Sequence, residues 1–244
     1  MEEKNLSVKD INLLEEKSLQ CLSKHIPPTP NFLLDVYRDT NQLREMYSDL
    51  NVDLVIGFFR CCGHKIQSIK YHLDNYLMWE KRYIKNFKEA LKCIPIKNLT
   101  IGSETPNLIF EYESFIIQFK ACLDIYSQAV GRLFKQNPSD ICGLKNVLEG
   151  NNSNQKAKRI LELIRKNKEW LDEFKSRQDF KSDRDKVTHY SVVNLGTLNV
   201  NKKNNKFRVI IHLKKKDMIL KNYLGERLKN LELFIQETTT LIRK

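Results

Sequence analysis

Apolar residues recur at alternating spacings of three and four in several long segments, and this spacing constrains the fold more than any other feature. In residues 103–133 the apolar positions are Phe115, Phe119, Cys122, Tyr126, Ala129 and Leu133. An α-helix has 3.6 residues per turn, so such a stripe lies on one helix face and must be buried. We expect Ser103 to cap this helix, with Pro106 in its first turn.

Two further stripes predict long helices over residues 64–93 and 222–242. The first holds Ile66, Ile69, Leu73, Tyr76, Tyr83, Phe87 and Leu91. The second holds Leu224, Leu228, Leu231, Ile235, Thr238 and Ile242. These stripes are typical of helices that pack together in a bundle.

Shorter elements connect these helices. A helix over residues 7–23 is followed by a proline linker at residues 27–30, and then by a short helical or irregular segment to about Gly57. We expect Pro138 and Gly143 to interrupt the helical pattern. A helix capped by Ser153 or Asn154 is expected to run to about Phe174, and its inward positions are Ile160, Ile164, Leu171 and Phe174.

From about residue 192 the sequence pattern changes from that of a helix to that of a strand. Residues 192–200 and 207–213 are β-prone, and the Asn- and Lys-rich residues 201–205 predict a turn between them. The expected fold is mainly α, an up-and-down helical bundle with a small β-hairpin, at about residues 192–213, inserted before the C-terminal helix. We expect residues 1–102 to form an N-terminal helical extension and residues 103–244 to form the bundle. The two parts are either separate units or one continuous domain.

The net charge of +12 is distributed unevenly along the chain. Residues 1–100 hold 15 Lys and Arg against 13 Asp and Glu, whereas residues 101–244 hold 27 against 17. Residues 181–216 alone hold ten Lys and Arg against two Asp. A solvated lysine-rich surface accounts for such a run, and so does a polyanionic partner, for which RNA is the first choice.

Several other classes of site have no support in the sequence. The cluster Cys61-Cys62-Gly63-His64 has no second Cys/His pair at zinc spacing, so buried thiols at a helix start are expected there. No phosphate-binding glycine motif and no nucleophile motif occurs. We expect no metal and no cofactor. The acidic N-terminus and the lack of a long apolar run predict a cytoplasmic protein that does not enter the membrane, with its six cysteines reduced.

Chemistry is indicated at one place, Arg184-Asp185-Lys186-Val187-Thr188-His189, within the basic stretch. An arginine can hold a phosphate through two parallel hydrogen bonds, and a histidine can move a proton near neutral pH. His189 lies five positions after Arg184, about 140° around an ideal helix. The two can therefore converge on one ligand only near a helix end, through the long stem of the arginine, or across a symmetric interface. His25, His64, His72 and His212 are assigned no role.

The pattern Arg-Asp-x-x-x-His, late in a helical bundle, resembles the HEPN superfamily. The motif of that superfamily is Arg, then four to six residues, then His, with a polar residue such as Asn, Asp or His directly after the Arg. The helix over residues 103–133 is similar to the first core helix of that family. The positions that carry this likeness are Glu113, Phe115, Phe119, Lys120, Leu123 and Asp124. The resemblance covers about residues 103–244.

This resemblance implies a metal-independent endoribonuclease that acts as a toxin or antiviral defence effector, as a homodimer. Arg184 would bind the scissile phosphate, and His189 would act as general acid or base. Asp185, Thr188 and Tyr190 would support them. An antitoxin or another regulatory protein would be a further partner.

RNA contacts are expected from basic residues around the motif and at the tip of the hairpin. These are Lys181, Lys186, Lys202, Lys203, Lys206 and Arg208. Two alternatives stay open. The first is a non-catalytic RNA- or protein-binding helical module that uses the basic hairpin. The second is a regulatory or scaffold protein whose charge serves only solvation.

Overall fold

The computed structural model describes residues 40–47, 50–92, 106–174, 199–200, 209–213 and 216–243, and this part of the chain is mainly helical, as predicted. The helices are α3 (Thr40–Met46), α4 (Val52–Leu91), α5 (Pro106–Leu133), α6 (Ile141–Gly150), α7 (Gln155–Lys166), α8 (Lys168–Leu171), the 3-10 helix η1 (Asp172–Phe174) and α10 (Leu220–Arg243). The strands are β1 (Asn199–Val200), β2 (Val209–Leu213) and β3 (Lys216–Ile219).

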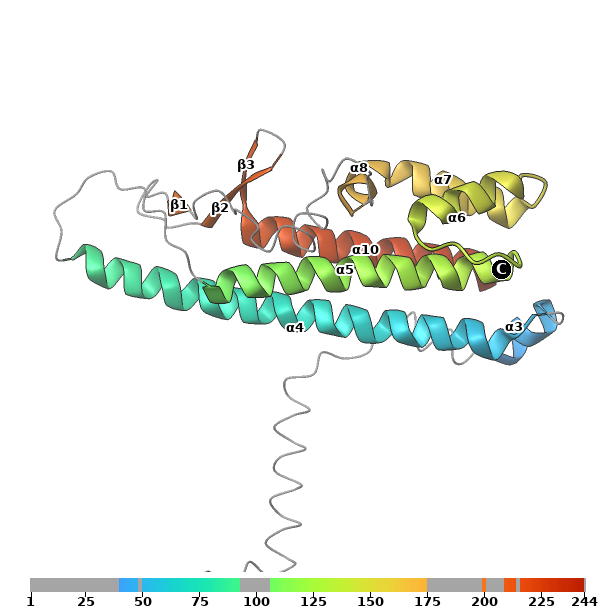
Figure 1. The fold of residues 1–244 in the computed structure, drawn as a ribbon, viewed down its shortest axis with the longest axis horizontal. Helices are drawn as coiled ribbons and strands as arrows, with labels where there is room; N and C mark the ends of the chain where they lie inside the picture. The colour runs from blue at the N-terminus through green and yellow to red at the C-terminus, as the bar shows by residue number, and fades with distance from the viewer. Residues whose placement is uncertain are drawn as a thin grey trace, which may run out of the picture.

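Helices α4, α5 and α10 run side by side along the long axis of the molecule (Figure 1). Helices α4 and α5 are antiparallel, because Cys62 lies beside Cys122 while His72 lies beside Glu111. Helices α6, α7 and α8 pack over α5 and α10, and the strands lie near the start of α10. The C-terminal end of α4 extends past the starts of α5 and α10 at the left of Figure 1.

The predicted stripes form the core. On α5, the stripe from Phe115 to Ala129 is buried and Leu133 is partly buried. All six stripe positions of α10 are buried. On α4, Ile66, Ile69 and Tyr76 are fully buried. Aromatic side chains join the helices in this core. Phe119 stacks on Phe174 with ring centroids 4.1 Å apart, and Phe234 of α10 contacts both Tyr126 and Trp170.

Helix α4 begins at Val52, so the predicted start near residue 64 is wrong. Its stripe continues backward through Cys62, Phe59, Val55 and Val52, all buried, at spacings of three and four. Gly57 costs a helix about 1 kcal/mol relative to Ala. Burying these side chains more than offsets that cost, since each contributes about 1.5–3 kcal/mol.

Helix α5 ends before Pro138, as expected, but the prediction that Gly143 also breaks the chain is wrong. Gly143 lies in the first turn of α6, where its N–H donates to the Asp140 side chain at 2.7 Å. The turn after α5 contains Lys135 with a left-handed φ of 57° and brings Pro138 back onto Gly131. A Cβ at Gly131 would overlap the Pro138 ring, so this close approach requires glycine.

The helix predicted to follow residue 154 is confirmed, with one interruption. The Asn154 side chain caps α7 by accepting from the N–H groups of Lys156 and Ala157. At Asn167 the helix breaks, and the chain continues as α8 and η1 to Phe174. The four inward positions predicted for this segment are all buried.

The β-hairpin expected over residues 192–213 is not established by the described part of the chain, and only Asn199–Val200 of its first arm is described. These two residues pair antiparallel with Ile210 and Val209 of β2. The longer pairing of β2 is with β3, a segment that was not predicted as a strand. Two residues separate β2 from β3, and such a short connection favours antiparallel pairing of its flanks.

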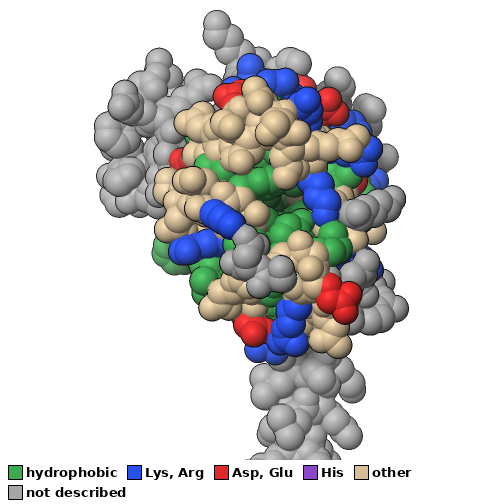
Figure 2. Space-filling model, turned by 90° about the vertical axis from the view of Figure 1, so that its right-hand side faces the viewer, with side chains coloured by type: hydrophobic (Ala, Val, Ile, Leu, Met, Phe, Trp, Pro, Cys, Tyr) green, Lys and Arg blue, Asp and Glu red, His purple; other side chains and the backbone are tan. Residues whose placement is uncertain are grey.

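Three elements meet at the end of the bundle that Figure 2 faces, and Lys156 of α7 joins them. Its Nζ donates to the carbonyl oxygen of Ile242 at 3.2 Å and to Tyr47 Oη at 3.3 Å. These bonds link α7 to α10 and to the residue that directly follows α3. Burial lowers the pKa of Lys156, and the carboxyl end of α10 favours its positive charge. Acidic and basic side chains are interspersed around the apolar centre of this face.

Other predictions lie outside the described residues: the helix over residues 7–23, the proline linker at residues 27–30, and the cap at Ser103. The boundary near residue 102 also lies outside and stays a prediction. Described residues on both sides of it, from Leu43 to Ile242, share one apolar core. In the described part of the chain, no helix is long and apolar enough to span a membrane.

Replacing Phe119 with Ala should lower the free energy of unfolding by about 3–5 kcal/mol, because it empties the centre of the aromatic cluster. Urea denaturation measures this loss. The matched control is Phe110→Ala on the same helix, where the ring is 60% exposed and the expected change is within about 0.5 kcal/mol. Equal losses in the two variants would contradict the described packing.

Buried tyrosines should make the fold sensitive to alkali. Burial raises the pKa of Tyr126 and of Tyr76, so both stay protonated in the folded chain after they ionise in the unfolded chain. The native state then binds more protons, and its stability should fall above about pH 10, by up to ~1.4 kcal/mol per pH unit for each tyrosine. Urea denaturation from pH 8 to 11 should show a shallower fall for Tyr126→Phe, but not for Tyr71→Phe at an exposed position.

Candidate functional site

The residues predicted to carry the chemistry lie outside the described part of the chain. These are Arg184, Asp185, Thr188, His189 and Tyr190 of the motif, and the basic residues Lys181, Lys186, Lys202, Lys203, Lys206 and Arg208. Their roles therefore stay predictions. The structure does describe the two flanks of residues 175–198, namely η1 on one side and β1 on the other.

The first flank is held to α10 by a nearly buried ion pair. Arg227 donates from Nε to Glu173 Oε2 at 2.7 Å and from Nη2 to Glu173 Oε1 at 3.0 Å. The two side chains are 10% and 12% exposed. Tyr223 donates its hydroxyl to the same carboxylate at 3.1 Å, and the Arg227 guanidinium lies over the Tyr223 ring. Two parallel hydrogen bonds fix both distance and orientation, so this pair sets where η1 meets α10.

The second flank is held to the same end of α10. Strand β1 pairs with β2, β2 pairs with β3, and β3 leads directly into α10 at Leu220. Both β2 and β3 contact α10. Both described flanks of the motif-bearing segment therefore lie against α10 or against the sheet joined to its start.

A row of lysines lies near this end of the bundle. Lys81, Lys85, Lys88 and Lys92 are all exposed and follow one another at spacings of four, three and four. On a helix this spacing keeps them within about 60° of one face. Together with Lys221, in the first turn of α10, they line a groove of about 650 Å³. We call it the lysine groove.

The other residues that line the lysine groove give it a net positive charge. Leu77 and Ile84 contribute apolar surface, and Glu80 and Glu89 contribute two carboxylates against the five lysines. Glu80 is only 3% exposed, so its carboxylate contributes little to the surface that a ligand would meet. Such a groove attracts anions, with a strength that depends on ionic strength.

The lysine groove was not predicted from the sequence, although a signal for it was present. The spacing Lys81-x3-Lys85-x2-Lys88-x3-Lys92 is visible in the sequence. Counting charge over residues 1–100 concealed it, because acidic residues elsewhere in that half nearly cancel the lysines. The contribution of Lys221 required the packing of α10 against α4.

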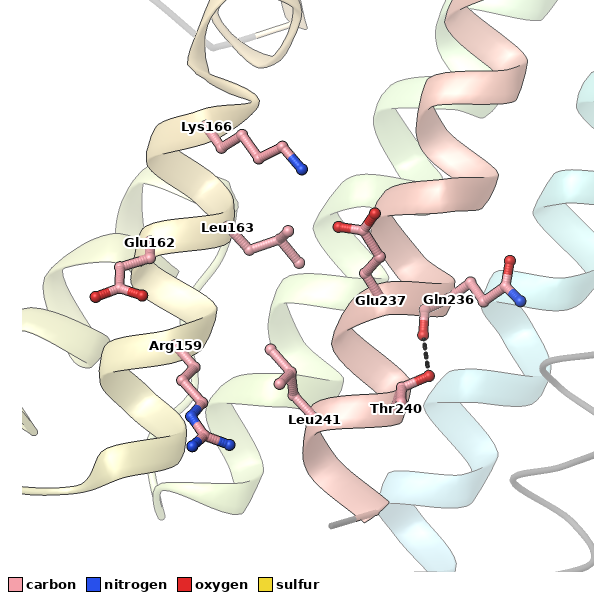
Figure 3. A pocket seen from close by; sticks show the side chains of 8 residues that line it. All are labelled: Arg159, Glu162, Leu163, Lys166, Gln236, Glu237, Thr240 and Leu241. Atoms are coloured by element: carbon pink, nitrogen blue, oxygen red, sulfur yellow. Dashed lines mark hydrogen bonds between the residues drawn. The ribbon is translucent and has the colours of Figure 1, made fainter.

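A second groove, between α7 and α10, has a different character (Figure 3). Arg159 and Lys166 line it from α7, and Glu237 lines it from α10. Lys166 and Glu237 extend toward one another across the gap, whereas Glu162 points away from it. With both signs present, this groove has no preference for a polyanion.

The cysteine cluster does not form a metal site with its neighbours. Cys62 is buried, and its Sγ lies 3.8 Å from the carbonyl oxygen of Cys122. Burial raises the pKa of the Cys62 thiol well above its ordinary value, which keeps it protonated and unreactive. Cys61 is exposed, so the prediction of a buried thiol is wrong there. Within the described residues, no three His, Cys, Asp or Glu side chains gather as metal ligands would.

No protein-family model, curated protein or solved structure matches this chain. Its function is therefore argued from its own residues: the motif, the described flanks of the motif-bearing segment, and the lysine groove.

Replacing Arg227 with Ala should lower the free energy of unfolding by about 3–5 kcal/mol, because Glu173 would keep a nearly buried charge without its partner. Thermal or urea denaturation measures the loss. Lys229→Ala, an exposed change on the same helix, should cost less than about 0.5 kcal/mol. The double variant Glu173→Met/Arg227→Met should recover most of the lost stability, because it leaves no buried charge without a partner. A double variant as unstable as Arg227→Ala would contradict this explanation.

Proposed function

We propose that this protein is a metal-independent endoribonuclease of the HEPN type, acting as a toxin or antiviral effector on cytoplasmic RNA. The observation that carries the proposal is the Arg184–His189 motif within the most basic stretch of a mainly helical chain. Support comes from the described flanks of that segment, which lie against α10 and its adjoining sheet. The lysine groove near the same end gives further support.

In the proposed reaction the ribose 2′-oxygen attacks the adjacent phosphorus, and the bond from phosphorus to the 5′-oxygen breaks. One proton leaves the 2′-hydroxyl and one reaches the departing 5′-oxygen. His189 transfers one of these protons, which a histidine can do near neutral pH. Arg184 binds the phosphate and stabilises the charge that develops on it. Asp185, Thr188 and Tyr190 support the two residues.

The reaction benefits from an acid and a base, and each chain supplies one motif histidine. A two-fold homodimer that brings two motifs together would supply both. We therefore propose a homodimer as the active form, with an antitoxin or another regulatory protein as a second partner.

A second candidate function is a non-catalytic RNA- or protein-binding module. The lysine groove favours it, because anion binding there would need no motif residue. The two functions differ in one property: the first requires His189 for turnover, and the second does not.

Incubation of RNA with purified protein in EDTA tests the nuclease proposal. His189→Ala should slow cleavage by about 10²–10⁴-fold while RNA binding is retained, because general acid–base catalysis contributes about this much. The control is His64→Ala, at an exposed position on α4, which should cut at the wild-type rate. If wild type binds RNA without cutting it and His189→Ala binds equally, the binding-module function replaces the nuclease.

A further inference from the structure

We propose that the lysine groove binds the phosphate backbone of single-stranded RNA and holds a substrate strand beyond the Arg184–His189 motif. This inference rests on the proposed RNA-directed function and adds a separate binding surface to it. The groove is built by two helices, α4 and α10, from residues 129 or more positions apart in the chain.

The spacing of the lysines suits a polymer with a regular charge repeat. Lys81 and Lys92 are eleven positions apart, and Lys92 is the residue directly after the end of α4. At 1.5 Å per residue, the row is about 16 Å long. A stacked nucleic-acid strand carries one phosphate per about 3.4 Å, so the row spans about five phosphates. A single small anion would need no such row.

The shape of the groove also suits a strand. Lys221 lines it from α10, so cations come from both helices that form the groove. Leu77 and Ile84 offer apolar surface within it, against which sugars and base faces can pack. A positively charged groove that follows the phosphate backbone is typical of surfaces that bind single strands without sequence preference.

The groove includes a residue that closely follows the second basic region in the sequence. Lys221 is five residues after Lys216, the first residue of β3, and β3 runs directly into α10. Residues 181–216 carry ten Lys and Arg. Both basic regions of the sequence are thus connected through the start of α10, which favours one extended partner.

A membrane surface fits these features less well. Helices that lie on membranes present a broad apolar face flanked by cations. Here the lysines line a hollow between two helices, and the apolar residues lie within that hollow. These features favour RNA over an anionic lipid surface, and a vesicle-binding assay distinguishes the two.

The test compares two variants that each lose three positive charges, in the full chain carrying His189→Ala. The groove variant is Lys81→Gln/Lys85→Gln/Lys92→Gln. The control variant is Lys158→Gln/Lys166→Gln/Lys168→Gln, at exposed positions on α7 and α8. Fluorescence anisotropy of a labelled single-stranded oligouridylate measures the binding constant across a salt titration, and circular dichroism checks the fold.

For the groove variant, the slope of the logarithm of the binding constant against the logarithm of salt concentration should be smaller in magnitude by about 2. Each lost phosphate contact on a single strand contributes about 0.7 to this slope. If the groove variant and the parent bind equally in 1 M salt, the variant should bind on the order of 100-fold more weakly than the parent in 0.1 M salt. The control variant should bind like the parent. Lys→Arg at the three groove positions keeps the charge and should restore binding.

Three results would overturn the proposal. The groove variant could bind RNA as tightly as the parent, or the groove and control variants could lose RNA binding equally. In the third result, the groove variant loses binding to phosphatidylserine vesicles but keeps its RNA binding. Cleavage assays of the same lysine substitutions in the chain that keeps His189 separate this proposal from the proposed nuclease. Weakened RNA binding by the groove variant, together with no RNA cleavage by the wild-type chain, retains the groove and rejects the nuclease. Cleavage with unchanged RNA binding rejects the groove and retains the nuclease.

Discussion

The burial of one face of α4 against one face of α5 is the constraint on which the rest of the structure depends. These helices are 40 and 28 residues long, and their apolar stripes meet along an antiparallel interface that includes Cys62 and Cys122. Small thiols at the crossing allow close approach, with each Sγ within 3.8 Å of the opposite carbonyl. Aromatic side chains of α5, above all Phe119 and Tyr126, then provide the surface on which α8, η1 and α10 pack.

One polar contact stands out within this apolar framework. The Glu173–Arg227 pair is nearly buried, and ion pairs in such surroundings stabilise folds weakly, because desolvation opposes their attraction. Its geometry is directional, unlike that of the apolar contacts around it. It specifies how η1 meets α10 at Glu173, two residues before the motif-bearing segment. We infer that the pair serves positioning more than stability.

The distribution of charge follows from which helices are neighbours. Acidic and basic side chains are mixed at the end of the bundle where Lys156 lies and along the groove between α7 and α10. At the other end, the lysine row lines one groove with Lys221 of the first turn of α10. The cations of that end come from distant parts of the chain. This gathering favours a polyanionic partner, which the proposed function identifies as RNA.

The sequence by itself determined the helices and their inner faces, because helical periodicity and side-chain caps are local properties. The stripes of α5 and α10 and the cap at Asn154 are predictions of this kind. The start of α4 was decided by tertiary burial of Val52, Val55 and Phe59, which overrides the weak local breaker Gly57. The place of Gly143 inside α6 and the β2–β3 pairing follow from local signals that were not used, namely the cap at Asp140 and the two-residue connection. The candidate site divides in the same way. The motif at Arg184 and His189 is a linear pattern, whereas the lysine groove exists only because α10 packs beside α4, and no local rule states which helices become neighbours.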